Sequence, residues 1–201
     1  MHVNKLVLAS GSPRRRELLS GLGLPFDVIV SDVDETIEEQ MPPEEMVRTL
    51  AYRKASAVSN TLQDGIVIGS DTIVVLDGQV LGKPVDEQDA RSMLSRLQGR
   101  AHTVYSGVAV IEASTGRHLV GHRSTLVHMR SLTDAEIVAY VQTGEPMDKA
   151  GSYAIQGIGS TIVDRIDGDY FTVVGLPMEL LASMLTSFGI HVLKATEDSK
   201  R

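Results

Sequence analysis

The sequence has no cysteine, no tryptophan and few aromatic residues of any kind. Phenylalanine, tryptophan and tyrosine together make up 4% of its 201 residues. Without cysteine the chain forms no disulfide, has no thiol nucleophile and offers no thiolate to a zinc ion. Proteins that bind single-stranded nucleic acid stack bases on aromatic rings, so the shortage of rings argues against that class.

Positive charge is also scarce. Lysine and arginine total 19 against 26 acidic residues, which gives a net charge of −7. Surfaces that hold long nucleic acids carry net positive charge, so we expect no such partner. No apolar run approaches the length of a membrane span, and the first residues lack a signal-peptide pattern. We therefore expect a cytoplasmic location and no membrane association.

The rest of the composition is that of a folded protein. Hydrophobic residues make up 42% and charged residues 22%, which is typical of a globular domain and not of a disordered chain. The length suits one large domain or two lobes that share a cleft. We expect residues 1–201 to form a single domain with a frayed tail at about 194–201.

Hydrophobic patterning predicts an alternation of strands and helices. Strands are predicted over 66–76, 103–111 and 118–129, with hairpin signals at Asp77-Gly78 and Asp167-Gly168. Helices are predicted from Pro13 to a stop at Gly23, from about 42–45, from Asp86 to Gly99, from a capping box at Thr133–Glu136, and over 177–188.

Three arginines occupy the first turn of the first predicted helix. An apolar strand leads through Ser10-Gly11-Ser12 into this helix, with Ser12 as N-cap. The positive end of the helix dipole repels Arg14, Arg15 and Arg16 unless an anion lies among them. The arginines are therefore either solvated or paired with carboxylates, or they form a cradle for polyphosphate. The turn aims free backbone donors at one point, which favours the cradle. The glycine pattern fits neither a P-loop nor a dinucleotide fingerprint.

Two further charges lie in apolar surroundings. Asp71 interrupts the apolar run 66–76, where an unpaired carboxylate is expensive to bury. It belongs either to a polar turn between two strands or to a functional site, and we favour the site because glycine or proline is missing beside it. Lys54 lies on the apolar stripe of its helix, four residues after Leu50. It either extends along the helix to solvent or points into a cleft, and the sequence does not decide between the two.

These elements contain the ingredients of phosphoryl transfer. Arginines and lysines, including Lys83 in a Gly-Lys-Pro loop, can hold a polyphosphate, while Asp71 and the acidic pair Asp34-Glu35 can hold a divalent metal or accept a proton. Mg²⁺ takes one or two carboxylates and completes its shell with water and phosphate oxygens. The polar loop 145–157 is either a connection or a wall of the site.

Several motifs occur in a defined order along the chain. They are Leu8-Ala9-Ser10-Gly11-Ser12-Pro13-Arg14-Arg15, Glu17-Leu18-Leu19, Asp34-Glu35, Lys54-Ala55, Ser70-Asp71-Thr72, Gly82-Lys83-Pro84, the stretch Asp148–Gly157, and Gly175-Leu176-Pro177. In this arrangement the sequence resembles the Maf family of nucleoside triphosphate pyrophosphatases over nearly its whole length. Ser70 stands where many relatives carry alanine, which changes no charge.

The resemblance implies a mixed α/β fold shared with the inosine triphosphate pyrophosphatases. That fold has a strongly curved central sheet flanked by helices, with two lobes around a deep cleft. Homodimers are common in the family, so a second copy of the chain is an expected partner. The implied activity is hydrolysis of a nucleoside triphosphate to a monophosphate and pyrophosphate, in the service of nucleotide-pool cleaning.

The resemblance also implies roles for individual residues. Asp71 is expected to be the general base and, with Glu35, to hold the divalent cation, Mg²⁺ or Mn²⁺. Lys54 is expected near the reacting phosphate. The residues expected to grip the triphosphate are Ser10, Arg14, Arg15 and Lys83.

Arg14, Thr72 and Gln156 match the branch of the family that acts on dTTP and UTP, with CTP and modified pyrimidine nucleotides as further candidates. An amide such as that of Gln156 both donates to and accepts from a pyrimidine edge. The alternative is a nucleotide-sensing regulator of septum formation and cell division that binds without turnover. The full set of carboxylates and lysines argues against it, because pure binding has no need of a base.

Overall fold

The computed structural model describes residues 5–36 and 41–193, and the predicted frayed tail lies outside them. The elements follow in the order β1 (Leu6–Leu8), α1 (Pro13–Ser20), β2 (Phe26–Val28), α2 (Pro43–Ser59), β3 (Ile66–Leu76), β4 (Gln79–Leu81), α3 (Glu87–Leu97), β5 (Ala101–Glu112), β6 (His118–Met129), α4 (Asp134–Gln142), the 3₁₀ helices η1 (Glu145–Asp148), η2 (Ala150–Ser152) and η3 (Gly157–Thr161), β7 (Val163–Asp167), α5 (Tyr170–Val174) and α6 (Met178–Ser187). This confirms a mixed α/β fold.

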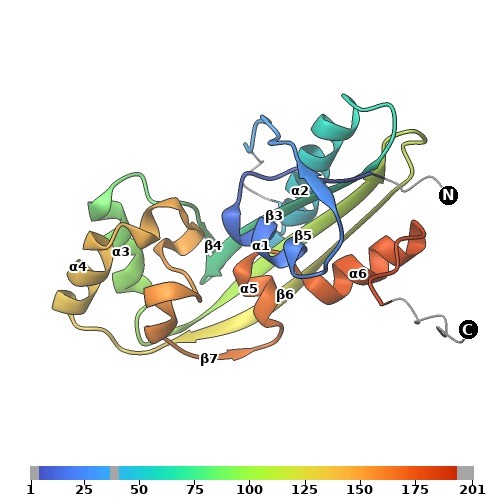
Figure 1. Ribbon diagram of the computed structural model, residues 1–201. Helices are drawn as coiled ribbons and strands as arrows, with labels where there is room; N and C mark the ends of the chain where they lie inside the picture. The colour runs from blue at the N-terminus through green and yellow to red at the C-terminus, as the bar shows by residue number, and fades with distance from the viewer. Residues whose placement is uncertain (1–4, 37–40, 194–201) are drawn as a thin grey trace, which may run out of the picture.

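The strands form one seven-stranded sheet in the order β2-β1-β3-β5-β6-β7, with β4 paired to β3. β1 runs parallel to both β2 and β3, whereas the pairs β3–β5, β5–β6 and β6–β7 are antiparallel. The long strands β3, β5 and β6 run through the whole molecule and join its two lobes (Figure 1). One lobe carries α1, α2 and α6, and the other carries α3 and α4.

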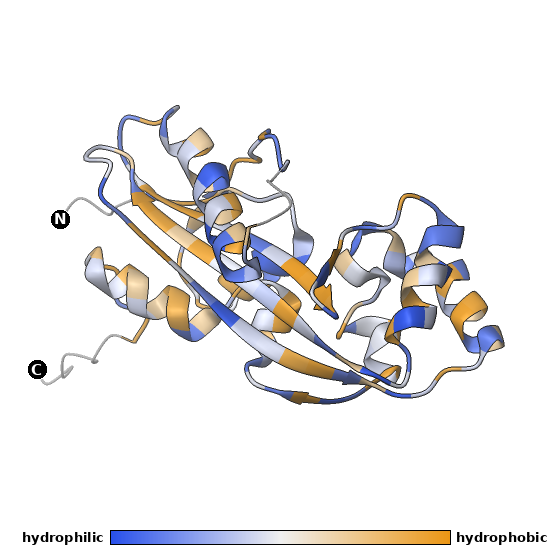
Figure 2. Ribbon diagram, turned by 180° about the vertical axis from the view of Figure 1, so that it is seen from behind, coloured by the Kyte–Doolittle hydropathy of each residue, from blue (hydrophilic) through white to orange (hydrophobic). Residues whose placement is uncertain are grey.

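Helices cover both faces of the sheet. Ala51 and Ala55 of α2 pack with Val67 and Ala109 on one face. Leu19 of α1 and a group of apolar residues from α6 pack on the opposite face, against alternate residues of the same strands. A separate apolar cluster fills the α3–α4 lobe. The strands are correspondingly rich in hydrophobic residues, whereas the helices of both lobes combine hydrophobic and hydrophilic residues (Figure 2). In the described part of the chain, no helix has the length and apolarity to cross a bilayer.

Local sequence signals account for most helix boundaries. The Ser12 side chain caps α1, Asp86 caps α3, and Thr133 with Glu136 forms the predicted capping box of α4. The predicted stop of α1 at Gly23 is wrong, because the Gly21 N–H already closes the helix at Ser20.

Two other local predictions change with the structure. The hairpin predicted at Asp167-Gly168 is wrong. β7 ends at Asp167, and Asp169 caps the short helix α5 by accepting from the backbone N–H groups of Phe171 and Thr172. The alternative of a polar turn around Asp71 is also wrong, because β3 continues without interruption from Ile66 to Leu76.

Candidate active site

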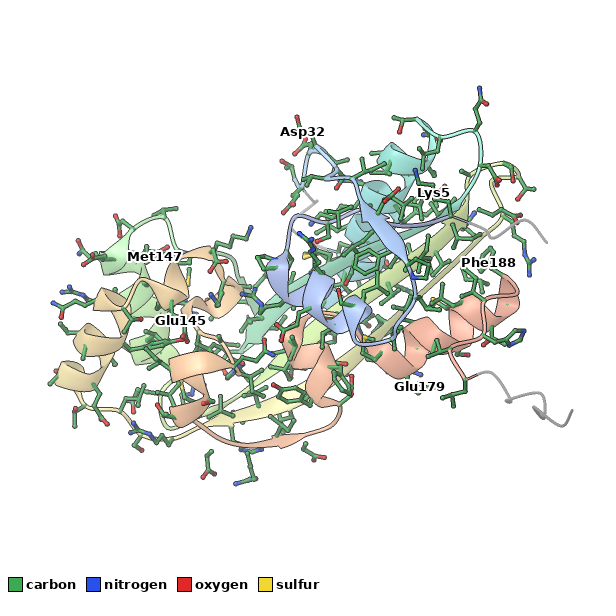
Figure 3. The ribbon with its side chains drawn as sticks, in the orientation of Figure 1. Lys5, Asp32, Glu145, Met147, Glu179 and Phe188 are labelled. Carbon is green, nitrogen blue, oxygen red and sulfur yellow. The ribbon has the colours of Figure 1, made fainter. Side chains whose placement is uncertain are left out.

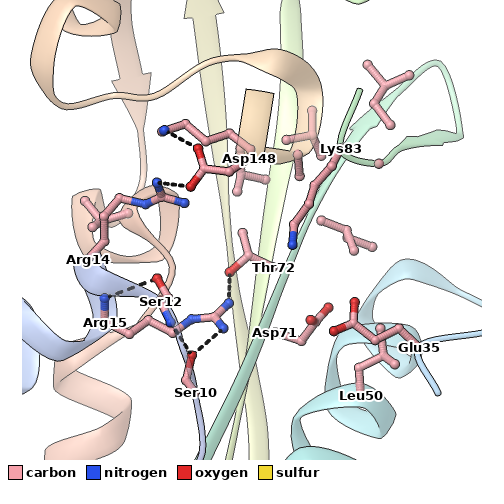
Figure 4. A pocket seen from close by; sticks show the side chains of 18 of the residues that line it. Ser10, Ser12, Arg14, Arg15, Glu35, Leu50, Asp71, Thr72, Lys83 and Asp148 are labelled. Carbon is pink, nitrogen blue, oxygen red and sulfur yellow. Dashed lines mark hydrogen bonds and ion pairs between the residues drawn. The ribbon is translucent and has the colours of Figure 1, made fainter. Parts of the chain in front are cut away.

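A cleft of about 1170 Å³ lies between the two lobes. Its walls come from the turn before α1, the acidic segment around Glu35, the middle of β3, the loop after β4 and the segment from Asp148 to Gln156. Figure 4 shows charged side chains entering it from several of these elements. The cleft brings together all of the predicted site residues: Ser10, Arg14, Arg15, Glu35, Lys54, Asp71, Thr72, Lys83 and Gln156.

Asp71 is buried in the middle of β3, with 6% of its surface exposed. Its position opposite Lys54 follows from two glycines. A Cβ at Gly69 or Gly107 would overlap the backbone of α2, so glycine at these positions lets the helix lie directly on the sheet. Asp71 follows Gly69 by two residues and therefore faces α2 as well. Close packing of helix and strand thus places Lys54 Nζ 2.6 Å from Asp71 Oδ1.

Lys54 also contacts the second predicted carboxylate. Its Nζ lies 2.8 Å from Glu35 Oε1, and its side chain is only 10% exposed, so it points into the cleft and not along the helix to solvent. Partial burial raises the pKa of Glu35, but the hydrogen bond from Lys54 and the charges of Lys83 and Arg15 outweigh burial and hold this pKa below its usual value. The two carboxylates are joined through one ammonium group.

Arg15 is held in place by backbone and side-chain acceptors. Its Nε donates to the Gly175 carbonyl at 2.8 Å, Nη2 donates to Thr72 Oγ1 at 3.1 Å, and Nη1 donates to Ser10 Oγ at 3.3 Å. Burial lowers the pKa of this guanidinium while Asp71 raises it. These bonds aim the planar fork of Arg15 into the cleft at a fixed angle.

The other two arginines of the turn differ from each other. Arg14 lines the cleft and reaches toward the opposite wall, where its Nη1 lies 3.9 Å from Asp148 Oδ2. Arg16 is exposed and borders a separate small hollow beside Phe26, away from the cleft. The predicted cradle therefore contains two of the three arginines.

The residues behind Arg15 and Thr72 were not predicted from the sequence. Thr72 Oγ1 lies 2.7 Å from the hydroxyl of Ser106, and Ser70 donates to the Gly175 carbonyl at 2.9 Å. Gly175 has φ +119° and brings its carbonyl to this point from the end of α5. The Gly175-Leu176-Pro177 motif was a signal for this turn, but nothing in it indicated a contact with Arg15.

The far wall has fewer fixed charges. Lys83 enters the cleft from the loop after β4 (Figure 4). Lys149, which the sequence did not single out, also lines the cleft and pairs with Asp148 at 2.6 Å. Gln156 lies next to Ile155 on this wall and is half-buried.

The carboxylates fit a hard divalent cation. Within residues 5–36 and 41–193, no group of three or more His, Asp or Glu side chains is arranged to hold a metal. Asp71 and Glu35 nevertheless converge on a single cationic group, and two carboxylates suffice for Mg²⁺ when phosphate oxygens complete its shell. The oxygen-only donor set is suited to Mg²⁺ or Mn²⁺ and not to softer metals.

Fold and site together define a mixed α/β protein whose interlobe cleft surrounds two carboxylates with cations, an arrangement suited to a phosphorylated ligand. The sequence from residue 5 to residue 188 matches the family described as Maf-like protein. The chain belongs to this family.

Two bacterial relatives align with almost the whole chain. The dTTP/UTP pyrophosphatase of Desulforamulus reducens is 53% identical over 188 residues, which cover 94% of this chain and 98% of the relative. The dTTP/UTP pyrophosphatase of Pelotomaculum thermopropionicum is 52% identical over 191 residues, covering 95% of this chain and all of the relative. Among solved structures, the Staphylococcus aureus Ham1 protein matches with a TM-score of 0.46 and 17% identity over 79% of each chain.

Proposed function

We propose that this protein hydrolyses dTTP and UTP to the nucleoside monophosphate and pyrophosphate. The observation that carries the proposal is the buried Asp71 on the floor of the cleft, bonded to Lys54 and placed between the arginines of α1 and Lys83. The names of the relatives, about half identical over almost the whole chain, supply the substrates.

The cations bind the triphosphate from two sides. Arg14 and Arg15 approach from the start of α1, where the positive end of the helix dipole also favours an anion, and Lys83 approaches from the opposite wall. The hydroxyl of Ser10, which already contacts Arg15, extends the same surface. Fixed donors around the phosphates lower the barrier because they need no reorganisation as charge moves to the leaving group.

Asp71 is the general base in this proposal. Lys54 engages Oδ1, so we assign Oδ2 to accept a proton from a water molecule in line with the bond between the α-phosphorus and pyrophosphate. Lys54 keeps the Asp71 carboxylate oriented and lies close to the phosphoryl group under attack. Glu35 shares the Lys54 ammonium with Asp71.

Asp71 and Glu35 are also the residues that would hold Mg²⁺ or Mn²⁺. When bound there, such an ion neutralises charge on the phosphoryl oxygens and on the departing pyrophosphate.

Gln156 is the residue we assign to the base. Its amide offers one donor and one acceptor group, which matches the alternating acceptor and N–H edge of uracil and thymine. Rotation of the amide presents the reverse order to cytosine, so CTP and modified pyrimidine nucleotides belong in any substrate panel.

The test is a panel of common nucleoside triphosphates assayed for released pyrophosphate with Mg²⁺, with Mn²⁺ and with EDTA. We expect dTTP and UTP to be hydrolysed fastest, with monophosphate and pyrophosphate formed in equal amounts and no turnover in EDTA. Tight binding of UTP without released pyrophosphate would contradict the proposal and favour a nucleotide-sensing regulator. Light scattering of the purified protein tests the predicted homodimer.

A further inference from the structure

The carboxylate of Glu145 caps a helix that begins well after it in the sequence. Glu145 is the first residue of η1, and its Oε2 accepts from the N–H of Ile158 at 3.0 Å while Oε1 accepts from the N–H of Gly159 at 2.8 Å. Both N–H groups belong to the first turn of η3, which has no side-chain cap of its own. A charged acceptor makes each of these bonds stronger than a neutral one would.

Tyr140 extends this bonding to the other side of the same segment. Its Oη donates to Glu145 Oε1 at 2.8 Å and accepts from the N–H of Ala154 at 3.2 Å. The tyrosine ring is anchored in the core of the α3–α4 lobe, with 4% exposure. One carboxylate and one phenol therefore fix the backbone at Ala154 and again at Ile158 and Gly159.

Gln156 lies between these two anchor points. It lines the cleft together with Ala154 and Ile155, whereas neither Glu145 nor Tyr140 does. Figure 3 places Glu145 in the lobe that carries α3 and α4, away from α1. The pair Glu145–Tyr140 supports the cleft wall from behind and does not itself form part of the wall.

The Glu145 carboxylate lies so close to the backbone of residue 157 that only glycine fits there without a rearrangement. Gly157 has φ +65°, and a Cβ there would collide with the Glu145 carboxylate. Burial raises the pKa of Glu145, but the N–H groups of Gly159 and Ile158 and the hydroxyl of Tyr140 more than offset burial and leave this pKa lowered. Glu145 is therefore ionised at neutral pH, as a helix-capping carboxylate should be.

We infer that Glu145 and Tyr140 are positioning residues for base selectivity: they hold segment 154–156 so that the Gln156 amide meets a pyrimidine edge. This inference rests on the proposed function, because it deepens the role given to Gln156. It predicts that weakening the anchor changes how the nucleobase binds but not how the phosphates bind.

The test uses Tyr140→Phe and Glu145→Gln, with Glu136→Gln as the matched control. Phenylalanine keeps the ring in the core and removes only the hydroxyl, and glutamine keeps the shape of Glu145 and removes its charge. Glu136 is a comparable helix-capping carboxylate, bonded to Thr133 and Arg130, on the same lobe but away from the cleft. Isothermal titration measures the Kd of α,β-imido-UTP, α,β-imido-ATP and inorganic tripolyphosphate, none of which requires turnover.

We expect both variants to bind α,β-imido-UTP about tenfold more weakly than the wild type, the loss typical of one well-made hydrogen bond. Binding of tripolyphosphate should stay within about twofold of the wild type, because it has no base for Gln156 to contact. The preference for the uridine over the adenosine analogue should shrink accordingly. Glu136→Gln should lower the melting temperature and leave all three Kd values unchanged.

Three results would overturn the inference. They are an unchanged ratio of uridine to adenosine affinity in both folded variants, an equal loss of affinity for tripolyphosphate and α,β-imido-UTP, and failure of both variants to fold. The last two would make Glu145 a residue of stability alone. Absence of pyrophosphate release by the wild type would instead contradict the proposed function, and the titrations would still decide the positioning role.

Discussion

The two walls of the cleft differ in the charge of the side chains that face it. On the wall formed by α1, α2 and β3, the side chains facing the cleft are charged and held by partners. Asp71 bonds to Lys54, and Arg15 is fixed by three acceptors. On the wall formed by segment 154–156, the side chain facing the cleft is a neutral amide, and the charge that matters, Glu145, lies behind it. Phosphates are alike in every nucleotide and are bound by strong charges, whereas a base is distinguished by the placement of a few neutral groups.

The charged wall also depends on mutual neutralisation. Lys54 and Asp71 are both buried, and removal of one partner leaves the other as an uncompensated charge. Glu35 partly compensates the charge of Lys54 when Asp71 is replaced, because it contacts the same ammonium from the exposed side of the cleft. Substitutions on this wall should therefore be chosen to keep volume and hydrogen bonding.

The largest expected effect is that of Asp71→Asn. Loss of a general base lowers kcat by about 10³-fold, and the decrease should be the same for dTTP, UTP and CTP because the proposal assigns contact with the base to Gln156 and not to Asp71. Nucleotide affinity should remain, since asparagine keeps the shape and Glu35 still neutralises Lys54. Steady-state kinetics with titration of α,β-imido-UTP checks both points.

The control for this variant is Asp164→Asn on the exposed strand β7, where the carboxylate Oδ2 lies 3.5 Å from Nη1 of its neighbour Arg165. It should leave kcat unchanged. Activity of Asp71→Asn close to that of the wild type would remove Asp71 from the mechanism.

The next largest effect is expected for Arg15→Lys. Lysine cannot reproduce the planar fork that joins Gly175, Thr72 and Ser10, so kcat/KM should fall by about 10²-fold for every nucleotide alike. The neighbouring Arg16→Lys offers a matched control, because Arg16 is exposed outside the cleft and its replacement should change kcat/KM by less than about twofold. An equal decrease of kcat/KM in the two variants would contradict the prediction that Arg15 belongs to a phosphate cradle.

A smaller effect is expected for Gln156→Ala. It distinguishes the function of the wall formed by segment 154–156 from that of the charged wall. The preference for UTP over ATP should fall by about tenfold, while the inhibition constant of tripolyphosphate stays unchanged. Competition assays measure both, with Gln142→Ala at the exposed end of α4 as control. An unchanged ranking of nucleotides would remove Gln156 from base recognition.

The smallest effect, and none on activity, is expected for Glu136→Gln. Hydrogen bonds from Thr133 and Arg130 lower the pKa of Glu136 to about 2. Because the folded-state pKa lies below the ordinary value of about 4.5, its stabilisation is fully present above pH 4.5 and is lost as pH falls toward 2.

The variant should therefore melt about 3 °C below the wild type at pH 7 and at the same temperature as the wild type near pH 2. Thermal scans across this range give the comparison, and a constant difference at all pH values would contradict it.

Much of this arrangement is encoded locally and was predictable. The strand-turn-helix around Ser12, the hairpin at Asp77-Gly78 and the caps at Asp86 and Thr133 each depend on a few adjacent residues. The motifs that carry the family resemblance identified residues that do meet in one cleft, although the roles given to them remain predictions.

What the sequence did not reveal depends on contacts between distant segments. The direction of Lys54 was undecided because it is set by Gly69 and Gly107, which admit α2 onto the sheet from two different strands. The cap of η3 was missed because the capping carboxylate, Glu145, lies outside the local window in which cap signals are recognised. The hairpin prediction at Asp167-Gly168 was wrong because an Asp-Gly pair indicates a turn but not whether a strand or a helix follows it.

Isotope labelling tests the central claim most directly. The claim is that the charged wall directs water to the α-phosphorus, so that pyrophosphate leaves intact. UTP is hydrolysed by the wild-type protein in ¹⁸O-enriched water, and the products are examined by mass spectrometry. We predict one ¹⁸O atom in UMP and none in pyrophosphate, whereas label in pyrophosphate or in inorganic phosphate would contradict the account.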